Sequence, residues 1–322
     1  MFASRFTRRA LAALALTLSP VAALHAAEPI RLVVGFAPGG GVDTLARVTA
    51  QALSKELDRT VIVENKSGAG GTISADYVSK SQADGNTLLF ADTSLLVAPY
   101  IYPALRYDLQ RDFAPIGMVG QSDLALAVPG DSPVKTVAEL IEAIRKAPPQ
   151  TETFASVGVG SVHHLGGELF ALQTKTELVH VPYRGGAPAS QALAAGEVSM
   201  SFASLASSIG LANSGRIRLL ATLSERRFPG MPDLPSVSET LPGYSVTPSL
   251  FMLAPQNVDP ALIATVSKAL ENSMQQKQVQ EAFLAQGSVA GYQDAQATEK
   301  WLGEETERWA NVIKTAQLDF KQ

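Results

Sequence analysis

Residues 30–57 read IRLVVGFAPGGGVDTLARVTAQALSKEL, and this stretch decides the fold class. Ile30–Phe36 is rich in aliphatic and β-branched residues, which favours a strand. Pro38–Gly41 is a glycine-rich turn. In Val42–Leu57 apolar residues recur at helical spacing, with polar residues on the opposite face. A strand that passes through a short turn into an amphipathic helix is the repeating unit of α/β proteins.

The same alternation continues along the chain. We expect further strands at Thr60–Glu64, Thr87–Ala91, Leu124–Val128, Thr153–Val157, Leu178–Tyr183, Val198–Ala203, Ile217–Thr222 and Leu250–Ala254. We expect further helices at Gly71–Ser81, Thr136–Lys146, Val162–Leu172, Ala187–Ala195, Pro260–Met274, Val279–Gln286 and Ala295–Ala316. This pattern predicts mostly parallel sheets flanked by helices. With 322 residues the chain is long enough for two domains of about 150 residues each.

The first 26 residues have the pattern of a signal peptide. Three arginines precede the apolar run Ala10–Leu18, and small residues follow up to Ala27. This order is typical of an exported protein, and the apolar run is shorter than the ~20 residues that a membrane-spanning helix needs. We therefore expect cleavage after Ala26 or Ala27 and a location in the periplasm. The general secretory route and the twin-arginine route are both open.

Composition narrows the classes of partner. Removing the leader takes away three arginines and no acidic residue, so the net charge moves from −4 to about −7. An acidic surface argues against nucleic acid, whose binding is dominated by Lys and Arg contacts to phosphate. The chain has no cysteine, so its stability has to come from burial and a zinc–cysteine cluster is excluded. We expect neither a metal nor a cofactor.

Motifs for catalysis are missing. The histidines after the leader are His163, His164 and His180, and none has the His-Glu-x-x-His spacing of a zinc hydrolase. Ser161 resembles a serine nucleophile in its glycine-rich surroundings, but His163 stands where the second glycine of a nucleophile elbow belongs. Pro38–Gly41 completes neither a dinucleotide-binding motif nor a P-loop. These absences predict a protein that is not an enzyme.

Glycine-rich turns recur between strands and helices, at Pro38–Gly41, Ser67–Gly71 and Gly158–Ser161. Glycine lets a ligand approach backbone N–H groups without obstruction by a Cβ atom. The helix N-terminus behind each turn adds unpaired donors and a positive partial charge, which suit a carboxylate. A single turn of this kind is more often only a tight connection. Three of them at the carboxyl ends of strands, where ligands of parallel sheets bind, favour a carboxylate-binding site.

Asp43 has two interpretations. It lies four residues before Arg47 on the polar face of the first helix, so an ordinary ion pair is feasible. Alternatively, Asp43 holds the glycine turn in shape or orients a bound water.

Several stretches together resemble one family. They are Phe36–Arg47, Val63–Gly71, Asp84-Gly85, Asp112–Gly117, His180–Gly186 and Gly215–Arg218. They are collinear and span nearly the whole chain after the leader. In this combination the chain resembles the substrate-binding receptors of tripartite tricarboxylate transporters, also known as the Bordetella uptake gene family. Ser67 departs from the proline that this family usually has there.

The resemblance implies a two-lobed α/β Venus-flytrap fold whose lobes are joined by crossing strands. After the leader at residues 1–26, it implies a first lobe at residues 28–124 and 250–322 and a second lobe at residues 125–249. A small organic acid is expected in the cleft between the lobes. The expected partner is the membrane permease of a tripartite tricarboxylate transporter, and the receptor itself is expected to be a monomer.

The site residues implied by the resemblance come from both lobes. The first lobe would contribute Ala37, Pro38, Gly39, Gly40, Gly41, Val42 and Asp43. The second would contribute Gly160, Ser161 and His164, with Phe202, Ala203 and Ser204 at the far end of the pocket. Two other functions stay open. One is a ligand sensor that serves a signalling protein and has no permease, and the other is a periplasmic serine hydrolase that uses Ser161 with His163 or His164.

Overall fold

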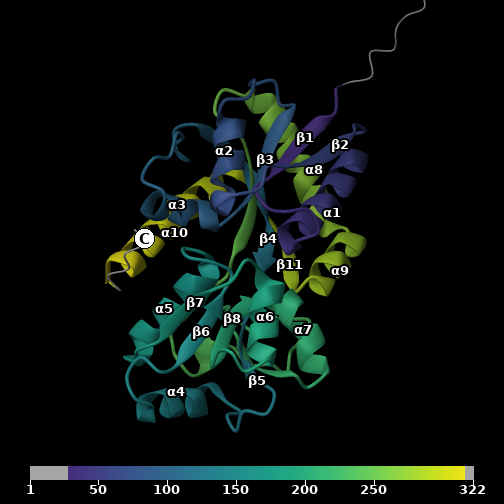
Figure 1. The fold of residues 1–322 in the computed structure, drawn as a ribbon. Helices are drawn as coiled ribbons and strands as arrows, with labels where there is room; N and C mark the ends of the chain where they lie inside the picture. Colours follow the sequence, from purple (N-terminus) through teal and green to yellow (C-terminus); the bar gives the residue numbers. More distant parts are fainter. Residues whose placement is uncertain (1–27, 316–322) are drawn as a thin grey trace, which may run out of the picture.

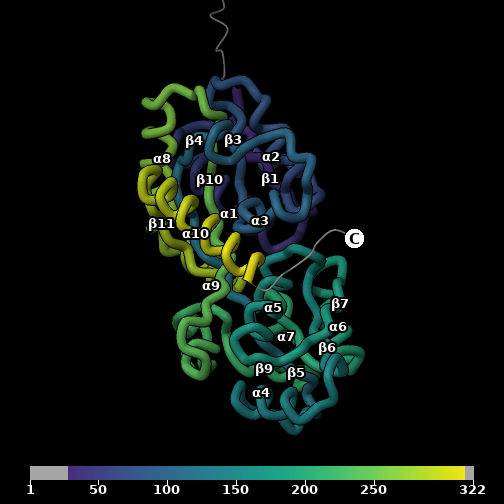
Figure 2. Tube along the Cα trace, turned by 90° about the vertical axis from the view of Figure 1, so that its left-hand side faces the viewer, coloured from purple at the N-terminus to yellow at the C-terminus, as the bar shows by residue number. Residues whose placement is uncertain are grey.

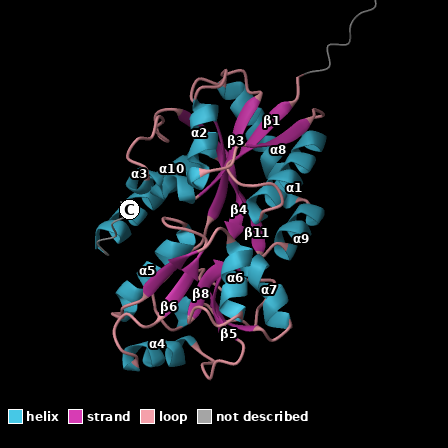
Figure 3. Ribbon diagram, viewed as in Figure 1, coloured by secondary structure: helices cyan, strands magenta, loops and turns pink. Residues whose placement is uncertain are grey.

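The computed structural model describes residues 28–315, and these form two lobes. Each lobe contains one β-sheet with helices packed on both of its faces (Figures 1 and 3). This is the two-lobed α/β architecture that the resemblance implies. The expected leader at residues 1–26, its cleavage at Ala26 or Ala27 and the expected helix end at Ala316 lie outside the described residues.

The first lobe is built on a six-stranded sheet with the strand order β11-β4-β10-β3-β1-β2. Its strands are β1 (Ile30–Val34), β2 (Val61–Asn65), β3 (Thr87–Asp92), β4 (Phe113–Ser122), β10 (Ser249–Pro255) and β11 (Ser288–Gln293). Its helices are α1 (Gly41–Glu56), the short 3-10 helix η1 (Ala69–Gly71), α2 (Thr72–Ser79), α3 (Ser94–Ile101), α8 (Pro260–Gln275), α9 (Lys277–Ala285) and α10 (Ala295–Thr315). The lobe is therefore assembled from both ends of the described chain.

Both faces of this sheet are covered, which explains why β1 is apolar along most of its length. Leu32 and Val34 pack into the core cluster that contains α1, α8 and α9. Val33 packs into the cluster that contains α2, α3 and α10, because successive side chains of a strand point to opposite faces. All three side chains are completely buried. Burial of each stabilises the lobe by about 1.5–3 kcal/mol.

The second lobe is built on a five-stranded sheet with the order β7-β6-β8-β5-β9. Its strands are β5 (Leu124–Pro129), β6 (Thr153–Ser156), β7 (Val179–Pro182), β8 (Met200–Ser204) and β9 (Ile217–Thr222). Its helices are α4 (Val137–Lys146), α5 (Val162–Thr174), α6 (Gly186–Ala194), α7 (Leu205–Asn213) and the 3-10 helix η2 (Val237–Glu239). In contrast to the first lobe, it is continuous in sequence.

The chain crosses between the lobes twice. Ser122 ends β4 and Leu124 begins β5, so only Asp123 lies between the two strands. On the return, Ser249 of β10 pairs with Gln121 of β4, which places the returning chain beside the outgoing one. We call residues 121–124 and 245–249 the hinge.

Helix α10 packs against both lobes (Figure 2). Leu302 lies in the first-lobe cluster with α2 and α3. Trp309 and Ile313 lie in the second-lobe cluster that also contains Leu165 and Phe202. The last described helix therefore belongs to the cores of both lobes. None of the helices within residues 28–315 is long and apolar enough to cross a membrane.

Two expectations about the sheets and elements are wrong. Of the nine strand pairings in the described chain, four are parallel and five antiparallel, so the sheets are mixed and not mostly parallel. The reason is that β10 and β11 return into the first sheet, and β5 runs against its neighbours β8 and β9. In addition, the sequence pattern did not predict α3, β4, α7 and β11. Glycine and proline inside β4 weaken its strand pattern, and α3 lacks a polar face. The expected domain boundaries stay a prediction.

Candidate functional site

The strand register places the glycine turns of both lobes at the hinge. In the first lobe Asp92, the last residue of β3, pairs with Leu250 at the start of β10. Strands β1 and β2 run parallel to β3, so they end at the same edge of the sheet. In the second lobe Ser204, the last residue of β8, pairs with Leu124. Since β6 is parallel to β8, the turn that follows β6 also faces the hinge. The predicted turns thus lie at facing ends of the two sheets.

The first-lobe turn is open to a ligand. Ala37–Gly41 is exposed and Val42 is half-buried. Gly39 has a φ of +80°, which favours glycine, and a Cβ added at Gly39 or Gly41 would meet nothing within 4 Å. The N–H groups of Gly41 and Val42 donate to no acceptor in the described part of the chain. Two adjacent donors at a helix N-terminus are suited to a carboxylate.

Asp43 holds this turn from behind. Its carboxylate accepts hydrogen bonds from the Gly39 N–H (2.8 Å), from Asn65 (2.7 Å) and from two nitrogens of Arg47 (2.9 and 3.0 Å). Burial raises the pKa of Asp43, but these hydrogen bonds outweigh it and hold the pKa below its ordinary value. The side chain is buried and both oxygens are used within the lobe. Asp43 does pair with Arg47, but it also bonds the backbone of the glycine turn. The geometry therefore supports the interpretation that Asp43 holds the turn in shape.

Asn65 is a member of this cluster that the sequence analysis missed. It ends β2, and its side-chain amide donates to Asp43 and to the Phe36 carbonyl (3.0 Å). Its oxygen accepts from Arg47 (3.1 Å). A polar residue at the end of a predicted strand is the signal that would have drawn attention to it. Asn65 connects the first glycine turn to the second strand.

The second-lobe turn has a similar internal scaffold. The Ser161 hydroxyl donates to the Gly158 carbonyl (2.7 Å) and accepts from the His164 N–H (3.2 Å), which caps α5. The Gly160 N–H donates to Nδ1 of His164 (3.1 Å). In the neutral ring the proton therefore lies on Nε2, which is 3.4 Å from the Glu168 carboxylate. Ser161 and His164 hold the turn, and the Gly160 N–H is already bonded.

Gly160 is also where the lobes touch. A Cβ at this position would lie 1.9 Å from Cδ1 of Ile101 in α3, a helix of the first lobe. The backbone φ of +73° favours glycine as well. The predicted glycine is therefore required by a close approach between the two lobes.

The three residues after β8 have different surroundings from those expected. Phe202 is completely buried, with its ring 5.5 Å from that of Phe154 and 5.7 Å from that of Phe170. Ala203 is buried beside it, so these two side chains pack in the core and do not line an open surface. Ser204 is half-buried, and its carbonyl accepts from two serines of α7. Of the three, only Ser204 is placed to face the hinge.

A pair of stacked imidazoles supports the second-lobe turn. The rings of His164 and His180 are 3.7 Å apart and nearly parallel, and His180 also stacks on Phe154. Nε2 of His180 lies 2.6 Å from the Ser156 hydroxyl, which accepts from the Gly158 N–H. Burial and the adjacent His164 lower the pKa of His180 to about 3. A neutral His180 is thus part of the folded turn.

Acid is expected to destabilise the protein through His180. Because its folded pKa lies below the unfolded value of about 6.5, the unfolded chain takes up the proton first, and stability falls as the pH drops from about 7 to about 5. The wild type should lose about 1–2 kcal/mol relative to His180→Gln over this range. Urea unfolding of both proteins at each pH measures the difference. Burial raises the pKa values of Asp92 and Asp123 to about 6, so these two carboxyl groups also make stability depend on pH. Both proteins contain them, and their contribution cancels in the difference between the two unfolding free energies. Equal losses in both proteins would contradict the prediction.

The two lobes are joined by crossing strands, and each lobe directs a glycine turn and a helix N-terminus toward the hinge. This arrangement is that of a binding protein. The chain belongs to a receptor family of this class, because the model of the tripartite tricarboxylate transporter family receptor matches residues 45–318. A similar curated relative is protein BugT of Bordetella pertussis, which is 35% identical over 94% of each chain. The resemblance inferred from the sequence is confirmed.

Solved structures agree with this assignment. Rpa4515 of R. palustris, solved with adipate, has a TM-score of 0.83 at 30% identity and covers 90% of this chain and 98% of its own. The periplasmic binding protein BugD has a TM-score of 0.79 at 29% identity, with coverage of 90% and 98%. MatC from Rhodopseudomonas palustris, with bound malate, has a TM-score of 0.77 at 26% identity, with coverage of 88% and 98%. The two-lobed fold is confirmed.

Proposed function

We propose that the protein is a periplasmic receptor that captures a small carboxylate-bearing organic acid between its lobes and delivers it to a tripartite tricarboxylate-type permease. The observation that carries the proposal is the pair of glycine turns at the facing ends of the two sheets. Relatives solved with adipate and malate support an organic acid as the ligand class. We infer export by the N-terminal leader and action as a monomer that docks on the permease.

The first-lobe turn is the part of the site that recognises the acid group. Its N–H groups at Gly41 and Val42 would donate to the carboxylate, and each such bond to a charged group contributes about 1.5–3 kcal/mol. Val42 and the exposed Val159 of the opposite turn offer apolar contact for the rest of the molecule. The remaining proposed contacts are Ala37–Gly40, Ser161 and Ser204, with Asp43, Gly160 and His164 positioning the turns. A ligand held by both lobes favours the closed arrangement.

The geometry also supports a protein without catalytic activity. A serine nucleophile needs a base within hydrogen-bond reach. The Ser161 hydroxyl instead bonds the Gly158 carbonyl and the His164 backbone N–H. Nδ1 of His164 is occupied by the Gly160 N–H. These contacts disfavour the serine hydrolase alternative.

The proposal predicts that at least one organic acid raises the melting temperature of the protein. A ligand at about a hundred times its Kd stabilises by about 2.7 kcal/mol, which corresponds to a rise of several degrees. Adipate, malate, benzoate and glutamate should be compared with adipamide, a neutral analogue that should have no effect. Failure of every acid to shift the melting temperature would count decisively against the proposal.

A matched pair of variants at Gly41 locates the binding. Gly41→Ala keeps the backbone N–H and places a methyl group in open space. Gly41→Pro removes the N–H, and proline is tolerated there because Gly41 is the first helical residue and Gly40 before it is extended, with φ −73° and ψ 165°. The proline variant should bind the acid about tenfold more weakly than the alanine variant. Equal affinities would show that this N–H does not hold the acid.

A further inference from the structure

The hinge contains a buried carboxylate that the proposed function does not use. The Asp123 N–H donates to the Gly287 carbonyl (2.9 Å), just before β11 of the first lobe. Its carbonyl accepts from the Leu205 N–H (3.0 Å), at the start of α7 of the second lobe. The Asp123 backbone is thereby fixed to both lobes. Its side chain is only 4% exposed, yet Oδ1 has no hydrogen-bond partner in the described chain.

Asp123 lies in the wall of a cavity of about 490 Å³ at the hinge. Both lobes and α10 contribute to this wall, including Gln121, Ser224, Ser245, Ser249, Val289 and Trp301. The serines offer hydroxyl groups, whereas Val289 and Trp301 offer apolar surface. The cavity therefore combines polar groups, an apolar wall and one buried acid.

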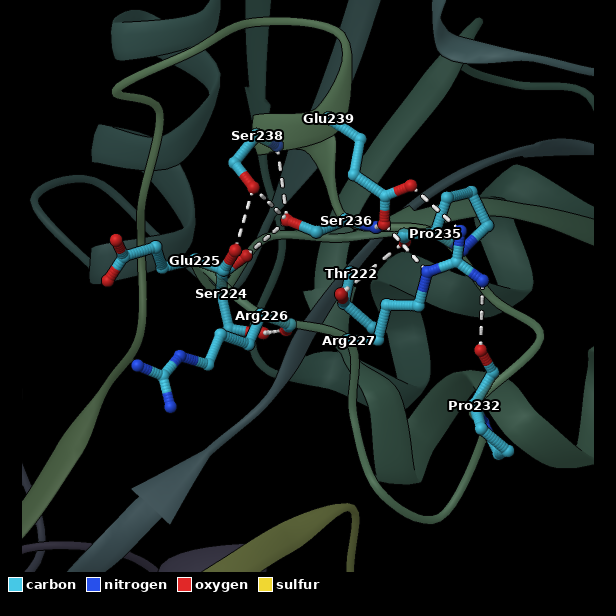
Figure 4. A network of polar contacts seen from close by, with 10 residues as sticks. All are labelled: Thr222, Ser224, Glu225, Arg226, Arg227, Pro232, Pro235, Ser236, Ser238 and Glu239. Carbon is cyan, nitrogen blue, oxygen red and sulfur yellow. Dashed lines mark hydrogen bonds and ion pairs between the residues drawn. The ribbon is translucent and has the colours of Figure 1, made fainter.

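Most other charges around the cavity are already paired. Arg308 pairs with Glu305 (2.8 Å) and also donates to the Ser245 carbonyl. Arg227 forms two bonds with Glu239 (2.7 and 2.8 Å), and Figure 4 shows that Arg226 reaches away from this network. Arg226 and Glu225 have opposite charges, are exposed and form no ion pair within residues 28–315. Asp123 therefore has no ion pair, although its carboxylate accepts a hydrogen bond from Ser224, and its Oδ1 accepts none in the described chain.

A buried carboxylate without an opposite charge is costly even when a hydroxyl donates to it, and a positively charged donor removes much of that cost. Burial raises the pKa of Asp123 to about 6, so most of it is charged at neutral pH. A primary ammonium group supplies both the opposite charge and N–H donors. Its alkyl chain would pack on Val289 and Trp301, and an ammonium close to an indole ring is also favourable.

We propose that the hinge cavity is a second binding site, which takes a small protonated alkylamine whose ammonium group donates to Oδ1 of Asp123. The site is separate from the glycine turns and does not depend on the proposed acid ligand. It is formed by residues of both lobes, so its occupant contacts both crossing segments of the hinge.

Titration of the full chain with n-butylammonium chloride tests this site, with butan-1-ol as the neutral probe of similar shape. Wild type should bind butylammonium saturably, and Asp123→Asn, which keeps the size of the side chain, should bind it at least about tenfold more weakly. Butan-1-ol should bind neither protein. Gly41→Pro, which lies outside the cavity, should bind butylammonium like the wild type.

Several results would overturn the proposal. They are no saturable binding of butylammonium, equal affinity in wild type and Asp123→Asn, or binding of butan-1-ol as tight as that of the amine. The comparison of the two probes uses only the wild type, so equally tight binding of butan-1-ol overturns the proposal even where Asp123→Asn fails to fold. Failure of the acid panel would leave the amine result unaffected, which keeps the two proposals distinguishable.

Discussion

Replacing Asp43 with alanine is expected to weaken binding of the organic acid about tenfold to a hundredfold and to lower the free energy of unfolding by about 2–4 kcal/mol. The carboxylate accepts four hydrogen bonds, from Gly39, Asn65 and Arg47, and its removal leaves these donors without their acceptor. The Gly39 N–H then no longer fixes the turn that presents Gly41 and Val42. Isothermal titration with the acid and urea unfolding measure the two effects.

Two further variants make this prediction specific. Asp43→Asn keeps an oxygen for the Gly39 N–H and should bind the acid more tightly than Asp43→Ala. Asp76→Ala removes a surface pair with Lys80 in the same lobe, and it should cost less than about 1 kcal/mol and leave binding unchanged. Wild-type affinity in Asp43→Ala would show that the turn keeps its shape without the carboxylate.

Replacing Trp309 with alanine is expected to lower the free energy of unfolding by about 3–5 kcal/mol. Trp309 is completely buried and connects α10 to the second-lobe core, while Leu302 of the same helix lies in the first-lobe core. The substitution therefore leaves a cavity and releases one end of the helix. Urea unfolding followed by fluorescence measures the loss, because Trp301 is then the remaining tryptophan.

The matched control lies on the exposed face of the same helix. Lys300→Ala removes an exposed side chain and should change stability by less than about 0.5 kcal/mol. A loss below about 1 kcal/mol in Trp309→Ala would contradict the anchoring of α10 in the second lobe.

The glycine turns could be predicted from the sequence because the features that form them are local. Pro38–Gly41 and Gly158–Ser161 each stand between a strand pattern and a helix pattern, and the structure places both turns where the strands end. Asp43 was recognisable for the same reason, since its partner Arg47 is one helical turn away. The two-lobed fold followed from the family resemblance and not from periodicity alone.

Contacts between distant segments could not be predicted in this way. The stack of His164 on His180 joins residues on different elements, and no spacing rule connects them. The mixed pairing of the sheets depends on where β10 inserts, which the local pattern of β10 does not specify. Likewise, the spacing of Trp301 and Trp309 along the last helix does not show that they pack in the cores of different lobes. Phe202 and Ala203 were expected to line the pocket, but both are buried, and Phe202 packs against the distant Phe154 and Phe170, contacts that the sequence pattern does not show.

The insertion of β10 between β3 and β4 also determines the order in which the chain can assemble. Strands β5–β9 are consecutive, so their sheet can form once residue 222 has emerged during synthesis or export. The first sheet stays divided until Ser249–Pro255 arrives, although β1 to β4 come first in the chain. Until then β3 and β4 have edges that can pair with other chains. The lobe that begins first is therefore completed last.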